Sequence, residues 1–148
     1  MNELTLKPEN ILPHRGRMLL IDRIAESDGK TYAIAEHDAR PERLYFDGHF
    51  PDHPIVPGML IVEMMFQTAG VLCRLIAQEA GLQGVRASGR AINVKNALFL
   101  KEVAPGSTIR IRAEKKFSLM QYTTLSAEAS VDGETVCKAE LTVLTHHE

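Results

Sequence analysis

The chain has 148 residues, of which 45% are hydrophobic and 24% charged, the composition of an ordinary globular protein that folds around one core. Its net charge of −2 offers no general attraction to a polyanion, so neither nucleic acid nor a membrane surface is expected as a partner. The N-terminal sequence MNELTLKPEN carries acidic residues and no apolar core, so we expect no secretory signal and a cytoplasmic location.

Two cysteines, Cys73 and Cys137, lie in apolar stretches and lack the CxxC spacing of a metal or redox site. We expect buried thiols in a reducing compartment, with a single disulfide as the alternative. Neither thiol is assigned a chemical role.

The first half of the chain is expected to hold a β-hairpin followed by a structured loop. Residues 17–26 (RMLLIDRIAE) are rich in branched apolar side chains and precede the turn SDGK, which indicates a strand. Residues 31–38 (TYAIAEHD) partly alternate and are the expected partner strand. Three prolines then exclude a regular helix or a central strand over residues 48–57.

One long helix is expected from Met59 onward, in MLIVEMMFQTAGVLCRLIAQEAGL, with Gly81 as its C-terminal stop. The stretch is apolar enough to raise the question of a membrane span. Its polar residues Glu63, Gln67 and Arg74 form one stripe, however, which favours a helix buried in a soluble protein. We interpret Arg74, near the far end, as ordinary amphipathicity.

Strands are expected in the rest of the chain, and Asp132-Gly133 between the last two is a strong hairpin signal. Two early strands, one long helix and several long strands predict an α+β fold in which the helix packs on an antiparallel sheet. The outermost strand would have unpaired backbone groups, so edge-to-edge pairing with a second copy is expected. The later strands are expected over residues 84–100, 107–119, 121–131 and 134–144.

The loop and the start of the helix carry groups suited to proton transfer. Glu63 has apolar neighbours in sequence, so desolvation is expected to raise its pKa toward the useful range. His49 titrates near neutrality on a proline-stiffened loop, which makes it a credible base. The N–H groups of Gly58 and Met59 are the first of the helix and could donate hydrogen bonds to an anionic carbonyl oxygen. Together these groups could remove a proton next to a carbonyl and expel a β-hydroxyl as water.

A longer motif surrounds these residues. Residues 46–70 are FDGHFPDHPIVPGMLIVEMMFQTAG, and further landmarks are PHRGRMLLIDRI at 13–24, PGSTIRI at 105–111 and VDGETVCKAEL at 131–141. In this order they resemble the 3-hydroxyacyl-[acyl carrier protein] dehydratases of type II fatty acid synthesis, of the FabZ type. The resemblance covers most of the chain. It implies a single hot-dog domain over residues 1–148, in which an antiparallel sheet wraps one central helix.

By position, the resemblance also implies roles for individual residues. His49 matches the catalytic histidine of the family and Glu63 its catalytic carboxylate, and in the family these two come from different subunits. Gly58 matches the residue whose amide holds the thioester oxygen, and Gln67 matches a supporting glutamine. Because dehydratase-isomerases have aspartate in place of Glu63, isomerisation is not predicted. The expected substrate-binding residues are Pro57, Gly58, Met59 and Gln67.

The implied reaction converts a (3R)-3-hydroxyacyl thioester to the trans-2-enoyl thioester and water. His49 would abstract the C2 proton, the Gly58 amide would stabilise the enolate-like oxygen, and Glu63 would protonate or position the departing hydroxyl. No metal or organic cofactor is expected, because the thioester already acidifies C2. The expected partners are an acyl carrier protein that bears the substrate and a second copy of the chain, in a homodimer that could assemble into a trimer of dimers.

The chain departs from the family pattern in a few places. Leu98 stands where arginine is expected and Glu102 where proline is expected, and GRM follows the PHR landmark where an aromatic residue and proline are common. These changes leave open the acyl chain length, the contact with the carrier and the choice between carrier and coenzyme A. A specialised pathway is an alternative to housekeeping fatty acid synthesis.

Other residues have plainer interpretations. His49 and His53 are four apart, but the prolines exclude the helix on which that spacing would serve a metal, so His53 is interpreted as a hydrogen-bonding loop residue. Arg110 and Arg112 alternate with isoleucines, which favours a solvated strand face over a contact with an acidic carrier. The apolar helix face is interpreted as core first and acyl tunnel second, and it consists of Met59, Met64, Met65 and Phe66.

Two other functions stay open at this point. One is a thioesterase on the same fold, which would also use a helix carboxylate. The other is a non-catalytic acyl-binding subunit that kept the shape, an alternative supported by the departures at Leu98 and Glu102. Release of free thiol would identify the thioesterase, and binding without turnover would identify the non-catalytic subunit.

Overall fold

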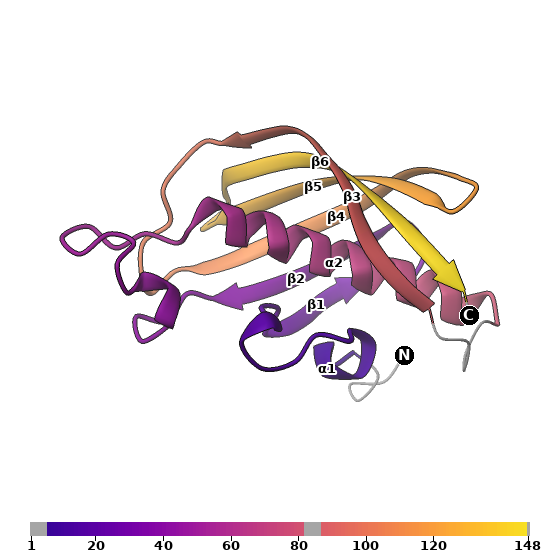
Figure 1. Ribbon diagram of the computed structural model, residues 1–148, viewed down its shortest axis with the longest axis horizontal. Helices are drawn as coiled ribbons and strands as arrows, with labels where there is room; N and C mark the ends of the chain where they lie inside the picture. The colour runs from indigo at the N-terminus through magenta and orange to yellow at the C-terminus, as the bar shows by residue number, and fades with distance from the viewer. Residues whose placement is uncertain (1–5, 82–86, 148) are drawn as a thin grey trace.

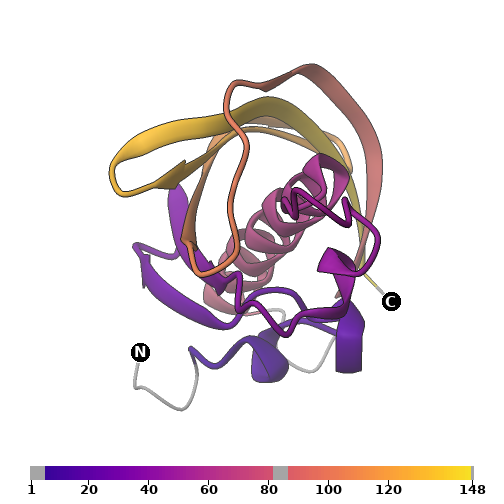
Figure 2. The same cartoon turned by 90° about the vertical axis from the view of Figure 1, so that its left-hand side faces the viewer.

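A computed structural model describes residues 6–81 and 87–147 of the chain. One antiparallel sheet curves around a long helix, α2 (Gly58–Glu79), as Figures 1 and 2 show. The strand order is β1-β2-β4-β5-β6-β3. This is the α+β hot-dog architecture expected from the sequence. The strands are β1 (Arg23–Ser27), β2 (Tyr32–Asp38), β3 (Ala87–Phe99), β4 (Thr108–Leu119), β5 (Tyr122–Val131) and β6 (Glu134–His147).

The central helix α2 begins directly after Pro57 and ends shortly before Gly81, whose φ of 79° suits a glycine beyond a helix end. By length and composition it could cross a membrane. Its side chains Met64, Met65 and Leu72 are nevertheless fully buried in the interior of the protein. It is therefore the core helix of the fold, as the polar stripe predicted.

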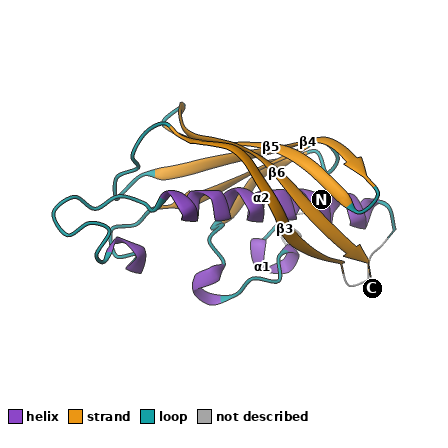
Figure 3. Ribbon diagram, turned by 45° about the horizontal axis from the view of Figure 1, so that its top comes forward, coloured by secondary structure: helices purple, strands orange, loops and turns teal. Residues whose placement is uncertain are grey.

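The N-terminal segment covers the side of α2 that the sheet leaves open (Figures 2 and 3). It contains α1 (Pro8–Ile11) and the 3₁₀ turn η1 (Gly16–Met18), and a second 3₁₀ turn, η2 (Leu44–Phe46), precedes the His49 loop. Leu12 is 3% exposed and packs so closely on the helix that a Cβ at Gly70 would lie 3.2 Å from its Cδ2. The helix therefore contacts this segment at Gly70, which has no side chain.

Two hairpins follow the predicted turn chemistry. Asp132 and Gly133 both have positive φ, 51° and 81°, the backbone of a type I′ turn between β5 and β6. In the first hairpin, Asp28 accepts the N–H groups of Lys30 and Thr31 at 2.9 and 2.8 Å. Both hairpin predictions are confirmed.

The strand expected over residues 17–26 is wrong at its start, because β1 begins only at Arg23. The backbone N–H groups of Leu20 and Ile21 donate to Oε1 of Gln67 on α2, at 3.0 and 3.4 Å. Since a helix side chain takes these donors, the segment cannot use them in a sheet ladder. Pairing with β2 starts with the N–H of Asp22, 2.9 Å from the Glu36 carbonyl.

A buried histidine on β2 ties three segments together. Nδ1 of His37 donates to the Leu20 carbonyl at 2.6 Å, so Nε2 must accept the hydrogen bond from the Tyr45 hydroxyl at 2.8 Å. Burial lowers the pKa of His37 and raises that of Tyr45 to about 12. The pair is therefore neutral, and it joins β2 to the N-terminal segment and to η2.

The two sheet edges are β1 and β3, and β3 carries the larger apolar surface. Ile92 and Val94 are 49% and 38% exposed, and among the described residues β3 pairs only with β6. On β4, by contrast, Ile109 and Ile111 are fully buried while Arg110 and Arg112 are exposed. The predicted solvated strand face is confirmed there, whereas β3 presents apolar side chains to solvent.

The apolar helix face is core only in part. Met64 and Met65 are fully buried, as predicted, but Met59 is 71% exposed, so its assignment to the core is wrong. It lies in the first turn and lines an open hollow together with Phe99 at the end of β3. Cys73 and Cys137 are free thiols, and burial raises the pKa of each to about 11.

Candidate active site

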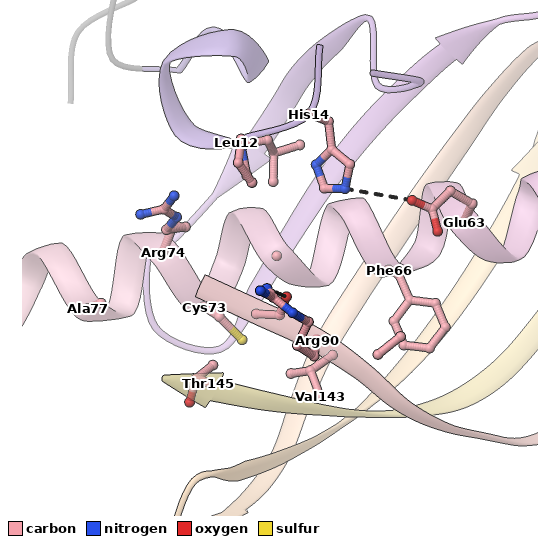
Figure 4. A pocket seen from close by; sticks show the side chains of 14 residues that line it. Leu12, His14, Glu63, Phe66, Cys73, Arg74, Ala77, Arg90, Val143 and Thr145 are labelled. Atoms are coloured by element: carbon pink, nitrogen blue, oxygen red, sulfur yellow. Dashed lines mark hydrogen bonds and ion pairs between the residues drawn. The ribbon is translucent and has the colours of Figure 1, made fainter. Parts of the chain in front are cut away.

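Glu63 lies at one end of a pocket between α2, the N-terminal segment and strands β3 and β6 (Figure 4). Its side chain is 31% exposed, and its Oε1 lies 3.7 Å from Nε2 of His14. Nε2 of Gln67 donates to the same oxygen at 3.1 Å. The carboxyl group therefore has polar neighbours, and the apolar surroundings expected from its sequence neighbours are not found in the single chain.

Gln67, one turn after Glu63, is 1% exposed and uses both ends of its amide. Its oxygen accepts from the N–H groups of Leu20 and Ile21, and its nitrogen donates to the Met18 carbonyl at 2.6 Å as well as to Glu63. A buried amide with this many partners has one allowed orientation. It therefore fixes the Glu63 carboxylate relative to the N-terminal segment.

His14 belongs to this cluster, although no pattern of residue types in the sequence singled it out. Its Nδ1 is buried and has no hydrogen-bond partner among the described residues. The neighbouring Arg15 fastens the turn that presents it, since Arg15 donates to the carbonyls of Leu12 and Glu9 at 2.7 and 2.9 Å. The only available signal was the PHR landmark, which contains both residues.

His49 lies on the proline-containing loop in a form suited to a base. Its Nδ1 is 3.2 Å from the Ile55 carbonyl, and because a carbonyl can only accept, Nδ1 carries a proton, so the lone pair of the neutral ring is on Nε2. The ring stacks on Phe50, with 4.4 Å between centroids. His53 bonds Glu102 at 2.7 Å and so links the loop to the chain after β3, which confirms its predicted hydrogen-bonding role.

Gly58 opens α2 under an aromatic ring. A Cβ built on Gly58 would lie 2.7 Å from Cε1 of Phe99, so only glycine lets the ring lie this close to the helix start. The first N–H groups of a helix have no intrahelical acceptor and lie at its positive end. They border a second hollow, which is lined by Ile55, Val56, Gly58, Met59, Ile61, Phe99, Leu100, Lys101 and Glu102.

The model of the FabA-like domain family matches residues 12–140. The chain belongs to the FabA-like family. Its relatives include the 3-hydroxyacyl-[acyl-carrier-protein] dehydratase FabZ of Agrobacterium fabrum, 39% identical over 92% of this chain and 85% of the relative. The enzyme of the same name from Ruminiclostridium cellulolyticum is 34% identical over 88% and 89% of the two chains.

Solved structures support the same fold. The dehydratase heterocomplex ApeI:P from Xenorhabdus doucetiae matches with a TM-score of 0.80 at 17% identity, over 95% of this chain and 91% of that one. A hypothetical thioesterase with coenzyme A from Streptococcus pneumoniae matches with a TM-score of 0.64 at 13% identity, over 84% and 85%. At these identities the likeness shows the hot-dog fold alone.

In this member of the FabA-like family, a single chain does not bring His49 and Glu63 together. Within the described residues no hydrogen bond or ion pair joins them, and His49 is absent from the lining of the Glu63 pocket. The surface near the His49 loop is apolar and open, with Phe50, Phe99 and Leu100 each about half exposed. The contacts around Glu63 are formed within one chain, whereas the apolar surface beside His49 is exposed to solvent.

Proposed function

We propose that the protein is a 3-hydroxyacyl-[acyl carrier protein] dehydratase of fatty acid biosynthesis or a related acyl pathway. The observation that carries the proposal is that the chain presents both proton-transfer groups in usable form. His49 has a free Nε2, and Glu63 is oriented by Gln67 beside a pocket. The FabZ relatives, whose names state this reaction, support it.

The proposed reaction moves one proton onto the enzyme and one off it. Nε2 of His49 takes the C2 proton while the N–H of Gly58 stabilises the negative charge on the thioester oxygen. The C2 electron pair forms the double bond as the C3–O bond breaks. Glu63 gives its proton to the departing hydroxyl, which leaves as water. Gln67 holds Glu63, Met59 lines the hollow beside the Gly58 amide, and Pro57 is the N-cap residue that precedes that amide.

The site is proposed to form between two copies of the chain, with His49 from one and Glu63 from the other. The exposed apolar side chains of β3 and its unpaired edge support pairing with β3 of a second copy. The resulting dimers could assemble into a trimer of dimers. We further propose that residues 1–148 act as one domain in the cytoplasm, with an acyl carrier protein as substrate carrier.

Turnover of 3-hydroxyacyl thioesters, on carrier protein and on coenzyme A, is followed by enoyl absorbance. We expect His49→Ala and Glu63→Gln each to lose activity by about a thousandfold, the range of a lost acid or base. Co-expression of the two inactive variants should restore about a quarter of the activity, because mixed dimers contain one intact shared site.

The failure modes of this experiment are distinct. Full activity of His49→Ala would remove the proposed mechanism. Inactive variants that never complement each other would place both groups in one chain and remove the shared site. Free thiol release would identify a thioesterase, and tight binding of all chain lengths without turnover would identify a non-catalytic subunit.

A further inference from the structure

We infer that the Glu63 pocket ends in an anion-binding subsite formed by Arg74 and Arg90, and that this subsite takes a carboxylate at the far end of the acyl chain. The inference rests on the proposed dehydratase function and adds a substrate class to it. It gives Arg74 a binding role, whereas the sequence pattern alone indicated simple amphipathicity.

The pocket follows one face of the central helix. Glu63, Phe66, Gly70 and Arg74 are spaced by three or four residues, so they line a continuous groove that begins at the carboxylate. Glu63 and Arg74 are eleven positions apart on the helix, a rise of about 16 Å. The opposite wall comes from Leu12 and from strands β3 and β6. Figure 4 shows Arg74 at the end of the pocket away from Glu63 and Arg90 nearer its middle.

The middle of the groove suits a hydrocarbon chain. Its walls there are Leu12, Phe66, Gly70 and Val143, and the cavity holds about 160 Å³. An enclosed volume near 150 Å³ accommodates a small apolar molecule of about six carbons. A short acyl chain that starts with its hydroxyl at Glu63 would therefore bring its last carbons toward the two arginines.

Arg74 and Arg90 lack the carboxylate partners that several other arginines in the protein have. Arg23, Arg43 and Arg110 each lie within 3.6 Å of a carboxylate. Among the described residues, no carboxylate lies within ion-pair distance of Arg74, and Arg90 donates only to the carbonyl of its neighbour Gly89. Arg74 is also partly buried in the pocket wall. Two arginines that line one pocket without acidic partners favour an anion in that pocket.

An anion on the substrate could come from the acyl tail or from the phosphate of the carrier arm. The tail is favoured because the hollow at Gly58, where the thioester oxygen is proposed to bind, shares no lining residue with the pocket that Glu63 and Arg74 line. The thioester arm is then held at the Gly58 hollow, outside the Glu63 pocket. The tail continues past Glu63 toward Arg74 and Arg90.

The test uses (3R)-3-hydroxyacyl thioesters of N-acetylcysteamine, which has no phosphate. Chains that end in a carboxylate are compared with their methyl esters and with plain alkyl chains of equal length. We expect kcat/KM for the carboxylate chains to be at least about tenfold higher, the worth of one charge-assisted contact. Arg74→Gln and Arg90→Gln should each remove that preference while turnover of the methyl esters stays within about twofold of wild type.

Arg110→Gln is the matched control, since it removes one exposed guanidinium on β4 and should leave the preference intact. Equal turnover of carboxylate and alkyl chains by the wild type would overturn the inference. So would an effect of Arg74→Gln that appears only with phosphopantetheine thioesters, because the anion would then be the arm's phosphate. If no thioester is dehydrated at all, the proposed function fails, which is a different result.

Discussion

The two halves of the proposed site differ in how completely one chain builds them. Around Glu63, the buried amide of Gln67 joins the helix to the N-terminal segment, and His14 approaches from the other side. Around His49, a single contact to the Ile55 carbonyl and a stacked ring hold the imidazole, and the adjoining apolar side chains are exposed. One half is closed by the fold, and the other is open.

This difference indicates what each half needs. A carboxyl group that must keep a fixed orientation benefits from a network whose members are all satisfied within the chain. A histidine that has to meet a partner's carboxylate must lie on an uncovered surface until that partner arrives. Monomer stability should therefore depend on the Glu63 half, and activity should depend on what covers the His49 half.

The largest expected effect comes from blocking the β3 edge. Replacing both Ile92 and Val94 with lysine puts like charges on the surface proposed to pair with a second copy. We expect a folded monomer with activity reduced by at least about a hundredfold, measured by analytical ultracentrifugation and enoyl absorbance. Met120→Lys, which changes a side chain 92% exposed at the β4–β5 turn, should change neither the oligomeric state nor the activity. A fully active monomer would contradict the shared site.

The next effect tests the closed half directly. Gln67→Leu leaves the N–H groups of Leu20 and Ile21 and the Met18 carbonyl without partners, so the free energy of unfolding should fall by about 3 kcal/mol. Urea denaturation measures it. Gln78→Leu, on an exposed face of the same helix, should cost less than about 0.5 kcal/mol. Equal costs for the two variants would show that the amide network contributes nothing.

A smaller effect is expected at the start of the helix. Gly58→Ala places a methyl group 2.7 Å from the Phe99 ring, and the forced displacement should cost about 1–2 kcal/mol of stability. Adding Phe99→Ala removes the obstacle, so the double variant should lose less than the two single changes combined. A double-mutant cycle by urea denaturation checks this. Simple additivity would mean that the ring does not meet the methyl group.

The smallest effect concerns pH. Because burial lowers the pKa of His37, the unfolded chain takes up a proton near the ordinary histidine value of about 6.5 that the folded chain does not. The free energy of unfolding should therefore decrease as pH falls below about 6.5, by at most about 1.4 kcal/mol per pH unit. His37→Gln should flatten this slope, whereas His53→Gln, at an exposed site, should keep it. An unchanged slope in His37→Gln would contradict the assignment.

Local sequence signals predicted the elements whose causes are local. The Asp132-Gly133 turn and the run of helix formers after Pro57 need no distant partner, and both were found where expected. The pattern around His49 and Glu63 predicted a loop and a helix start correctly. In each case the backbone conformation is set by residues within a few positions.

Long-range contacts account for the differences. The segment before Arg23 has strand propensity, but its backbone N–H groups at Leu20 and Ile21 donate to Gln67, which lies 47 and 46 positions away in the sequence. The approach of His14 to Glu63 likewise joins distant parts of the chain. The polar stripe on α2 was visible in the sequence, but it did not indicate that Arg74 would line the same pocket as Glu63. These contacts depend on how the elements pack, which periodicity does not encode.

The contact between Gly70 and Leu12 has a consequence for how this fold diversifies. One added methyl group at Gly70 would narrow the groove by meeting Leu12 at 3.2 Å, two helical turns away from the carboxylate that handles protons. The maximum length of the bound tail would then be set by a single carbon atom. Natural variants that differ only at this position could process shorter chains while their chemistry stays the same.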